Sequence, residues 1–191
     1  MTERKTLKAM ILLAEGAEEI ETIAVVDILR RASINVSVCA IGKQMIKCSR
    51  DVIIVGDCVL SEKCCPAADF DLVYMPGGLG GTKVLCDNKI VGSILEDFIK
   101  ADKWICAMCA APTVFIHHGN LLNDHKITSH PLVKEDMLKA GYSNYSEDRV
   151  VVDRKLITSR GPGTALEMAL KIVEEIVGVE EAQEIAAAIV A

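Results

Sequence analysis

The segment from Trp104 to Thr113 constrains the fold of this chain more than any other stretch of its sequence. The apolar run Trp104–Met108 is typical of a short strand that is buried on both faces, as in a parallel sheet covered by helices. The run stops at Cys109, and a helix is expected from Ala110, with Pro112 in its first turn, where a missing N–H is harmless. A strand that turns directly into a helix predicts an α/β fold.

This corner places the thiol of Cys109 at the start of the predicted helix. Unpaired backbone N–H groups and the helix dipole favour a thiolate at such a position. Ala107, Ala110 and Ala111 are small enough for the tight turn that surrounds the serine of a nucleophile elbow. An arbitrary cysteine is more often a buried packing residue. The position at the corner nevertheless predicts a nucleophile elbow with Cys109 as the reactive residue.

Strands and helices alternate along the rest of the chain. Strands are expected at residues 8–14, 35–41, 71–75, 104–108 and 126–129, with short β segments within 47–60 and paired strands within 150–159. One helix is expected from the acidic segment 15–21 to about residue 32, and others at 90–101, 164–177 and 180–190. A further helix is expected to begin at residue 110, and a short one that follows Pro131 is expected to end at residue 139. This alternation predicts a flavodoxin-like three-layer sandwich, with a mostly parallel sheet covered by helices on both faces. Residues 1–191 carry no repeat or linker and are expected to form a single domain.

Charge and hydropathy exclude several classes of function. The net charge of −6 and the pI of about 5.3 argue against direct binding to nucleic acid or to anionic membranes, which requires a basic surface. No apolar run reaches membrane-spanning length, and the first six residues lack the apolar core of a signal peptide. We therefore expect a cytoplasmic protein that does not bind membranes. The nucleus and the mitochondrion are further candidate compartments, for which charge and hydropathy give no argument.

The eight cysteines show neither a disulfide framework nor a metal-ligand spacing. The one C-x-x-C pair, Cys106 and Cys109, has no second pair and no pair of histidines beside it. Cys106 lies within the predicted strand and faces away from Cys109, which indicates a packing role. No role is assigned to Cys64 and Cys65. The sequence thus predicts free thiols and no metal site.

Four segments that each follow a predicted strand are expected to meet at the carboxyl edge of the sheet, where α/β proteins bind ligands. They are residues 15–21, residues 76–81, Cys109, and Ser129 with His130. Their convergence at one edge predicts one shared site.

Glu21 differs from the other acidic residues of its segment. Ala24, Val25 and Ile28 follow it at helical spacing, so Glu21 is expected on the buried face of a helix. Burial raises the pKa of a carboxyl group. A protonated Glu21 would donate a hydrogen bond to a thiolate, and an ionised one would act as a general base. The alternative is an acidic first turn that only complements the helix dipole.

Three further groups are candidates for the site. His130 precedes Pro131, which favours an extended and fixed backbone, and its ring would shuttle protons for Cys109. The alternative is a loop histidine that is hydrogen-bonded in place. The backbone N–H groups of Gly78 and Ala110 are candidate oxyanion donors. The alternative for the glycine-rich segment is a plain turn.

Seven ordered motifs together resemble the DJ-one family, the parkinsonism-associated deglycases of the ThiJ/PfpI superfamily. They are AEGAEEIE (14–21), VDILRR (26–31), KCSRDV (47–52), MPGG (75–78), CAAPT (109–113), TSHP (128–131) and ITSRGPGT (157–164). The resemblance implies that Cys109 is the oxidisable nucleophile, Glu21 its protonated partner and His130 the active-site histidine. It also implies that Gly78 and Ala110 supply the oxyanion donors.

The same resemblance implies a second, peripheral redox-sensitive thiol at Cys48, near a dimer interface. It further implies a homodimer that forms through the first helix, with Asp27 and Arg31, and through the segment from Cys48 to Asp51, which contains Arg50.

For function, the resemblance implies a glyoxalase that needs no cofactor, no metal and no glutathione. Its substrates would be methylglyoxal, glyoxal and their early adducts with proteins or nucleotides, in the context of oxidative-stress protection. The alternative is a redox-sensing protective or chaperone protein, in which oxidation of Cys109 to the sulfinate is the signal and turnover is incidental. A cysteine peptidase is a weaker alternative, because no third group that would orient His130 stands beside it in the sequence.

Overall fold

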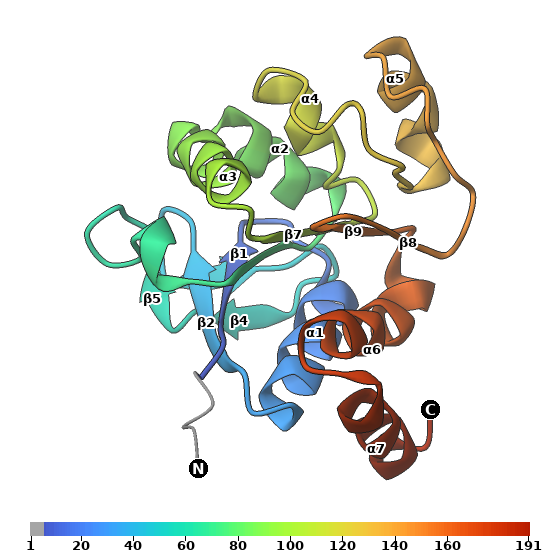
Figure 1. The fold of residues 1–191 in the computed structure, drawn as a ribbon. Coiled ribbons are helices and arrows are strands. Elements are labelled where there is room, and N and C mark those ends of the chain that lie inside the picture. The colour runs from blue at the N-terminus through green and yellow to red at the C-terminus, as the bar shows by residue number, and fades with distance from the viewer. Residues whose placement is uncertain (1–5) are drawn as a thin grey trace.

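The computed structural model describes residues 6–191, which form a layered α/β structure (Figure 1). The strands are β1 (Lys8–Leu13), β2 (Asn35–Ala40), β3 (Met45–Lys47), β4 (Ile53–Val55), β5 (Cys58–Val59), β6 (Leu72–Met75), β7 (Trp104–Met108), β8 (Val150–Asp153) and β9 (Leu156–Ser159). The helices are α1 (Glu19–Arg31), α2 (Leu79–Asp87), α3 (Lys89–Lys100), α4 (Thr113–His117), α5 (Lys134–Lys139), α6 (Ala165–Ile176) and α7 (Val179–Ile189).

Seven of these strands form one sheet in the order β5-β2-β1-β6-β7-β9-β8. All neighbouring pairs are parallel except β8 and β9, which form the expected antiparallel pair. Strands β3 and β4 form a separate antiparallel ribbon. The sheet therefore has the mostly parallel topology that the alternation of strands and helices predicts.

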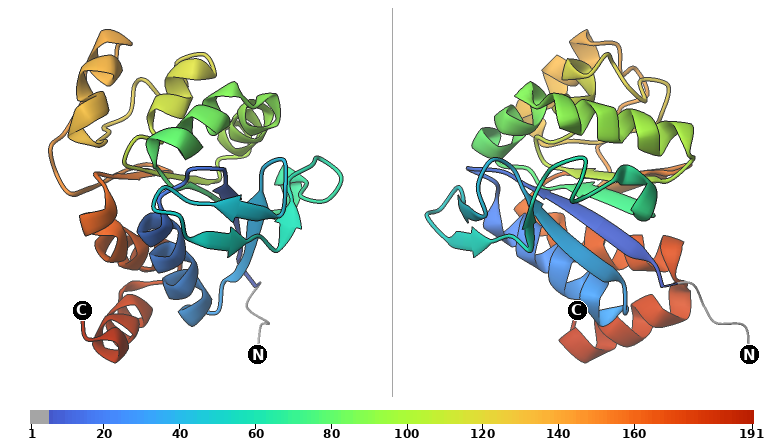
Figure 2. Two further views of the ribbon diagram at one scale, coloured as in Figure 1. Left: turned by 180° about the vertical axis from the view of Figure 1, so that it is seen from behind. Right: turned by 90° about the vertical axis from the view of Figure 1, so that its left-hand side faces the viewer.

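Helices cover both faces of this sheet (Figure 2). Helices α1, α6 and α7 lie on one face, and α2, α3, α4 and α5 lie on the other (Figure 1). The central strand β1 supplies both cores: Ala9, Ile11 and Leu13 pack on the α1 side, and Met10 and Leu12 pack on the opposite side. Successive residues of a strand point to opposite faces, so a strand between two helical layers must be apolar throughout. The three-layer architecture is confirmed.

The expected strand at residues 126–129 is wrong. This segment makes a single bridge, between Ile127 and Tyr145, and lies outside the main sheet. The edge of β7 that such a strand would need is already occupied by β9. Thr128 and Ser129 are instead buried in a loop, where the N–H of Thr128 donates to Oγ1 of Thr158 at 3.0 Å.

Two helices also differ from expectation: α2 was not predicted at all, and α4 begins later than predicted. Helix α2 was not expected, because the glycines of residues 76–81 indicate a turn. Gly80 and Gly81 lie within this helix, where a Cβ on Gly81 would come within 2.7 Å of the Cα of Ala17, so only glycine allows this close packing. Helix α4 begins at Thr113 rather than at Ala110, and residues 110–112 form a turn.

None of the helices within residues 6–191 is both long enough and apolar enough to span a membrane.

Candidate active site

An open pocket of about 700 Å³ lies at the carboxyl ends of the central strands. Its lining includes residues from all four segments that were expected to converge, together with the loop between β3 and β4. Among the lining residues are Glu15, Cys48, Gly78, Cys109, Ala110 and His130. The segment with His130 reaches the pocket although it does not follow a strand.

Cys109 occupies the corner after β7 in a left-handed backbone conformation, with φ of 61°. Such a conformation is costly for a residue with a side chain and persists only where the surroundings enforce it. Here the N–H of Cys109 donates to the carbonyl of Ser159 at 2.9 Å, and its carbonyl accepts from the N–H of His130 at 2.8 Å. These two bonds fix the corner from both sides. The side chain of Cys109 is partly buried and faces the pocket.

Glu21 lies on the buried face of α1, as its spacing predicts, and is fully buried. The N–H of Gly77 donates to Oε2 of Glu21 at 2.6 Å, while the hydroxyl of Tyr74 donates to the Glu21 backbone carbonyl at 3.0 Å. Oε1 is buried and makes no hydrogen bond of normal geometry with any described residue. Burial raises the pKa of Glu21 to about 7, although the N–H of Gly77 opposes the rise.

Gly77 sets the approach between this carboxyl group and the thiol. A Cβ on Gly77 would lie 2.5 Å from the Cβ of Cys109 and 2.8 Å from Oε2 of Glu21. Any side chain here would therefore force the two groups apart. Gly78 was predicted as a site residue from the sequence and Gly77 was not, although the pair of adjacent glycines after a buried strand is a signal for both. Gly78 has φ of 84°, and a Cβ there would lie 2.5 Å from the carbonyl oxygen of Gly16.

The expectation that the corner alone favours a thiolate needs correction. Burial and the Glu21 carboxylate raise the pKa of Cys109 to about 12, although the backbone N–H groups of Gly78 and Ala110 lower it. The physical reasons are the partial burial of the thiol, its acidic neighbour, and a helix that starts late and has only five residues. Two coupled groups of this kind titrate as a pair. A proton on Glu21 removes the repulsion, so that the pair can hold one proton and one negative charge on sulfur.

His130 reaches the pocket from the loop before α5, with a partly buried side chain. Its Nδ1 accepts from the N–H of Leu132 at 3.2 Å, and its ring packs near Gly161, where a Cβ would come within 3.3 Å of Cδ2. No hydrogen bond joins the His130 ring to Cys109 among the described residues. The structure thus brings the two residues together through their backbones and through the shared pocket.

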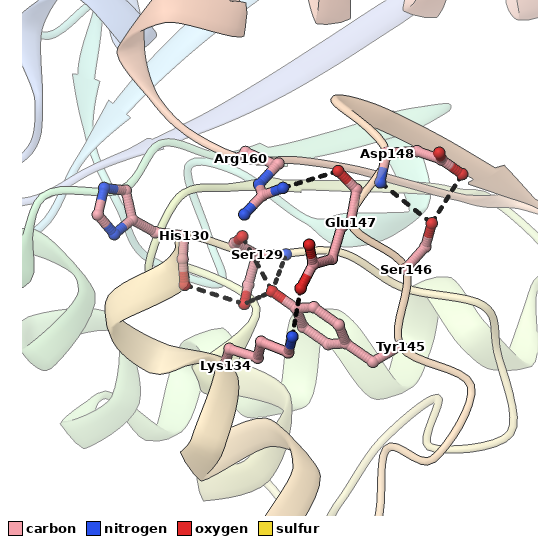
Figure 3. Close-up of polar contacts among 8 residues, drawn as sticks. All are labelled: Ser129, His130, Lys134, Tyr145, Ser146, Glu147, Asp148 and Arg160. Atoms are coloured by element: carbon pink, nitrogen blue, oxygen red, sulfur yellow. Dashed lines mark hydrogen bonds and ion pairs between the residues drawn. The ribbon is translucent and has the colours of Figure 1, made fainter.

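A polar network anchors the His130 loop, and the His130 ring points away from it (Figure 3). The hydroxyl of Tyr145 accepts from the N–H of Ser129 at 3.2 Å and donates to the Ser129 carbonyl at 3.1 Å. Arg160 donates to the carbonyl of Glu147 at 2.7 Å, which ties the next part of the loop to the end of β9. Tyr145 was not predicted as part of the site, because it lies sixteen residues from Ser129 and follows no motif.

Cys48 is buried between β3 and β4 and lines the same pocket as Cys109. Burial, followed by the negative charges of Glu19 and Glu18, raises the pKa of Cys48 to about 11. The structure therefore places Cys48 beside the candidate active site, whereas the resemblance implied a peripheral position. Its redox sensitivity stays a prediction.

The residues expected at a dimer interface are exposed in the single chain. Asp27 and Arg31 form an ion pair of 2.7 Å along α1. The side chain of Arg50 is exposed, while its N–H donates to Oε1 of Glu19 at 2.8 Å. Glu19 was not singled out in the sequence. It is buried at the start of α1 and also accepts from the hydroxyl of Ser49 at 2.8 Å, so it holds the Ser49–Arg50 loop against the helix.

Comparisons with known proteins agree with this architecture. The DJ-1/PfpI family model matches residues 7–175. Protein dj-1beta of Drosophila melanogaster is 46% identical over 93% of this chain and 94% of its own length. Glutathione-independent glyoxalase DJR-1.2 of Caenorhabditis elegans is 40% identical over 91% of this chain and 90% of its own length. The crystal structure of Drosophila melanogaster DJ-1beta has a TM-score of 0.87 at 42% identity, covering 97% of this chain and 98% of that one. The resemblance drawn from the motifs is confirmed, and the chain belongs to the DJ-1/PfpI family.

Proposed function

We propose that this protein is a glutathione-independent glyoxalase, in which Cys109 attacks the aldehyde of methylglyoxal or glyoxal and the product is a 2-hydroxy acid. The observation that carries the proposal is the pairing of a thiol at an enforced corner with a buried carboxyl group whose pKa is raised to about 7. A group with a pKa near neutral both accepts and donates protons at physiological pH. The name of the Caenorhabditis elegans relative supports the same activity.

The first step is the attack of the Cys109 thiolate on the aldehyde carbon. The proton of the Cys109 thiol first passes to the Glu21 carboxylate; the C–S bond then forms, the carbonyl electrons move to the oxygen, and Glu21 returns its proton to that oxygen. The N–H groups of Gly78 and Ala110, which already reach the sulfur, are placed to stabilise the developing negative charge on that oxygen. Protonation of the oxygen gives a hemithioacetal.

The remaining steps move protons and add water. Glu21 removes the hydrogen from the former aldehyde carbon as a proton while the neighbouring carbonyl oxygen gains a proton, which gives an enediol. Return of a proton to the neighbouring carbon, with loss of the O–H proton from the sulfur-bearing carbon, then gives a thioester. His130, at the same pocket, supports these transfers. Water then cleaves the thioester, which releases the hydroxy acid and restores the thiol. Each step uses groups of this chain and water, and the net reaction adds one water to the substrate.

The same nucleophile would act on the early adducts of these aldehydes with proteins or nucleotides. The pocket is open to solvent and wide enough, at about 700 Å³, for an adduct carried on a larger molecule. An adduct assay with an added amine that traps free aldehyde separates direct removal from scavenging. Faster adduct loss with protein and trap together than with the trap alone supports direct removal, whereas equal rates support scavenging.

A redox sensor is the second candidate function, and Oε1 of Glu21 favours it specifically. Within residues 6–191 this buried oxygen has no hydrogen-bond partner of normal geometry, and it belongs to a carboxyl group that interacts with Cys109. If protonated, it would donate to a sulfinate oxygen on Cys109 and stabilise the oxidised form. In this reading the oxidised protein acts as a protective or chaperone protein.

The deciding experiment measures lactate formation from methylglyoxal by freshly reduced protein, without metal and without glutathione. Cys109→Ser is expected to abolish turnover, because the nucleophile is lost. Cys106→Ser is the matched control, since Cys106 lies three residues earlier, within β7, and is fully buried in the core. Turnover that survives in Cys109→Ser, or that is absent from the reduced wild type, would exclude the glyoxalase proposal.

We also propose a homodimer formed through α1 and the β3–β4 ribbon, with Asp27, Arg31 and Arg50 at the interface. The support is a set of exposed apolar side chains on these elements. Their exposed fractions are 47–60%, and they are Ile20, Ile23, Met45, Val52, Ile53 and Val55. Exposed apolar side chains that gather on neighbouring elements mark protein interaction sites.

A further inference from the structure

Three thiols meet at the edge of the sheet away from Cys109. The Sγ atoms of Cys39, Cys58 and Cys65 are separated by 3.1 Å (Cys58 to Cys65), 3.4 Å (Cys39 to Cys65) and 3.6 Å (Cys39 to Cys58). We call these residues the three-thiol cluster. Strands β1 and β6 lie between β2, which carries Cys39, and β7, which precedes Cys109. The cluster is therefore separate from the candidate active site.

Two features of the fold bring the three thiols together: the pairing of β2 with β5 and the loop that follows β5. Cys39 and Cys58 are directly opposite partners in the parallel pair of β2 and β5, so their side chains point to the same face. The loop after β5 folds back over that face, and the N–H of Cys65 donates to the carbonyl of Ser61 at 2.9 Å. Lys103 ties down the following residues by donating to the carbonyl of Ala68 at 2.9 Å. The sequence spacing gave no sign of the cluster, because its third member comes from a loop.

The triangle of sulfur atoms fits a pyramidal site. A circle through the three Sγ atoms has a radius of about 2 Å, whereas a metal–thiolate bond is about 2.3 Å long. An ion bonded equally to the three sulfurs therefore lies above their plane rather than in it. Such a pyramid is the geometry of an ion that carries a lone pair opposite its three ligands.

The surroundings of the cluster select the charge of the ion. Cys39 and Cys65 are buried and Cys58 is half-buried, and the carboxylate of Asp57, the residue before Cys58, already places a negative charge nearby. Cys39 and Cys65 pack in the apolar core with Leu60 and Phe70. Net negative charge is costly in such a setting. Three thiolates with a trivalent ion leave no net charge, whereas a monovalent or divalent ion leaves an anion.

We propose that Cys39, Cys58 and Cys65 form a binding site for a trivalent thiophilic ion, with arsenic(III) as the matching probe. Arsenous acid would exchange its three As–O bonds for three As–S bonds. The three thiol protons leave with the three hydroxyl groups as three waters, and neither arsenic nor sulfur changes oxidation state.

The cluster is open to such a ligand from two sides. Cys58 is partly exposed on the edge strand. Cys65 lines a surface pocket of about 280 Å³, together with Glu62, Pro66 and Asp97. A small neutral molecule such as arsenous acid can therefore reach the sulfurs without opening the core.

The test is native mass spectrometry of the reduced protein after addition of arsenite. We expect one arsenic to be gained and three protons to be lost, which shows three As–S bonds. Cys58→Ser should abolish this three-proton signature. It should also weaken binding at least about 100-fold, since loss of even an outer-shell partner costs 10- to 100-fold in metal affinity. Cys64→Ser is the matched control, because Cys64 is adjacent to Cys65 but exposed and outside the cluster; it should bind as the wild type does.

Cys65→Ser and Cys109→Ser complete the design. Cys65→Ser repeats the loss at a loop residue, which guards against a folding defect in β5, and thermal melting checks that each variant is folded. Cys109→Ser should bind arsenite normally, so failure of this proposal is distinguishable from failure of the glyoxalase. The proposal is overturned if arsenic keeps a hydroxyl group, if binding requires Cys109, or if zinc binds where arsenite does not. It is also overturned if arsenite does not bind and peroxide instead joins Cys58 and Cys65 in a disulfide.

Discussion

Cys109 and Glu21 lie on either side of Gly77, and their chemistry depends on where one proton resides. The buried carboxyl group has a pKa of about 7, and its negative charge is one of the groups that raise the pKa of the thiol. Protonation of Glu21 therefore makes the thiolate easier to form. A cysteine whose pKa is lowered by a neighbouring cation is already a thiolate at neutral pH. At Cys109, in contrast, formation of the thiolate depends on whether Glu21 carries a proton.

Glu21→Gln separates the two candidate functions. The amide still donates a hydrogen bond to an oxidised sulfur, but it cannot carry a proton through the enediol. We expect oxidation to the sulfinate to persist and lactate formation to be lost, as measured by intact mass after peroxide treatment and by product assay. Equal loss of both would show that the two functions do not divide at this residue.

The raised pKa of Glu21 predicts a dependence of stability on pH. Folding raises this pKa from its usual 4.5 to about 7, so the folded state holds more protons than the unfolded state between these values. The free energy of unfolding should therefore fall as the pH rises through this window, by about 3 kcal/mol at most. Urea unfolding at pH 5 and pH 8 measures the change. Glu21→Gln should remove most of it, and an identical pH dependence in the variant would contradict the assignment.

Gly77→Ala tests the close approach of the thiol and the carboxyl group. The new Cβ would lie 2.5 Å from the Cβ of Cys109, so these side chains must move apart. A misplacement of about 1 Å costs on the order of 100-fold in rate, and overpacking costs about 1–3 kcal/mol in stability. Gly163→Ala is the control, because its Cβ would meet no atom within 4 Å. Similar kcat values for the two variants would contradict the role of Gly77.

At the scale of elements, the sequence predicts what hydrophobic pattern and local chemistry determine. The apolar run before Cys109, the paired strands at 150–159 and the last two helices are found within a few residues of expectation. Helix α2 was missed because glycines normally break helices, and these fit only through contact with Gly16 and Ala17, which lie far away in sequence. The segment at 126–129 has a strand-like sequence, but tertiary pairing of β7 with β9 leaves it no neighbour.

In the candidate site, too, the residues that depend on contacts distant in sequence could not be predicted. Glu21 and Cys109 could be predicted because the spacing on α1 and the strand–helix corner are local signals. Gly77, Tyr145 and the three-thiol cluster depend on contacts between segments that are distant in sequence. A single sequence carries no direct signal for such contacts.

Tyr145→Phe tests the anchoring of the loop that carries His130. It removes a hydroxyl that bonds both the N–H and the carbonyl of Ser129, and we expect a stability loss of about 1–2 kcal/mol. Because His130 follows Ser129 directly, lactate formation should also slow. Tyr142→Phe is the matched control: its hydroxyl donates to the carbonyl of Leu121 at 2.7 Å, outside the pocket. It should lose similar stability but keep full activity; activity lost equally in both would contradict a local effect.

At the scale of the whole molecule, the proposed dimer predicts a response to charge on the β3–β4 ribbon. Ile53 and Val55 are exposed by 58% and 60% in the single chain. Aspartate at both positions should shift the protein to monomers in light scattering at micromolar concentration, because a buried charge without a partner is costly. Leu138→Asp, at an exposed residue of α5, is the control and should leave the mass unchanged. A wild-type monomer would contradict the proposal directly.

The order of strands in the sheet has a consequence for synthesis on the ribosome. The corner at Cys109 is held by the carbonyl of Ser159, at the end of β9, which is made fifty residues later. Chains emerge from their N-terminus, and contacts of high sequence separation form late. The nascent chain therefore carries its thiol without the corner that orients it until about four-fifths of the protein has been translated. The arrangement that orients Cys109 beside Glu21 is thus completed only in a nearly complete chain.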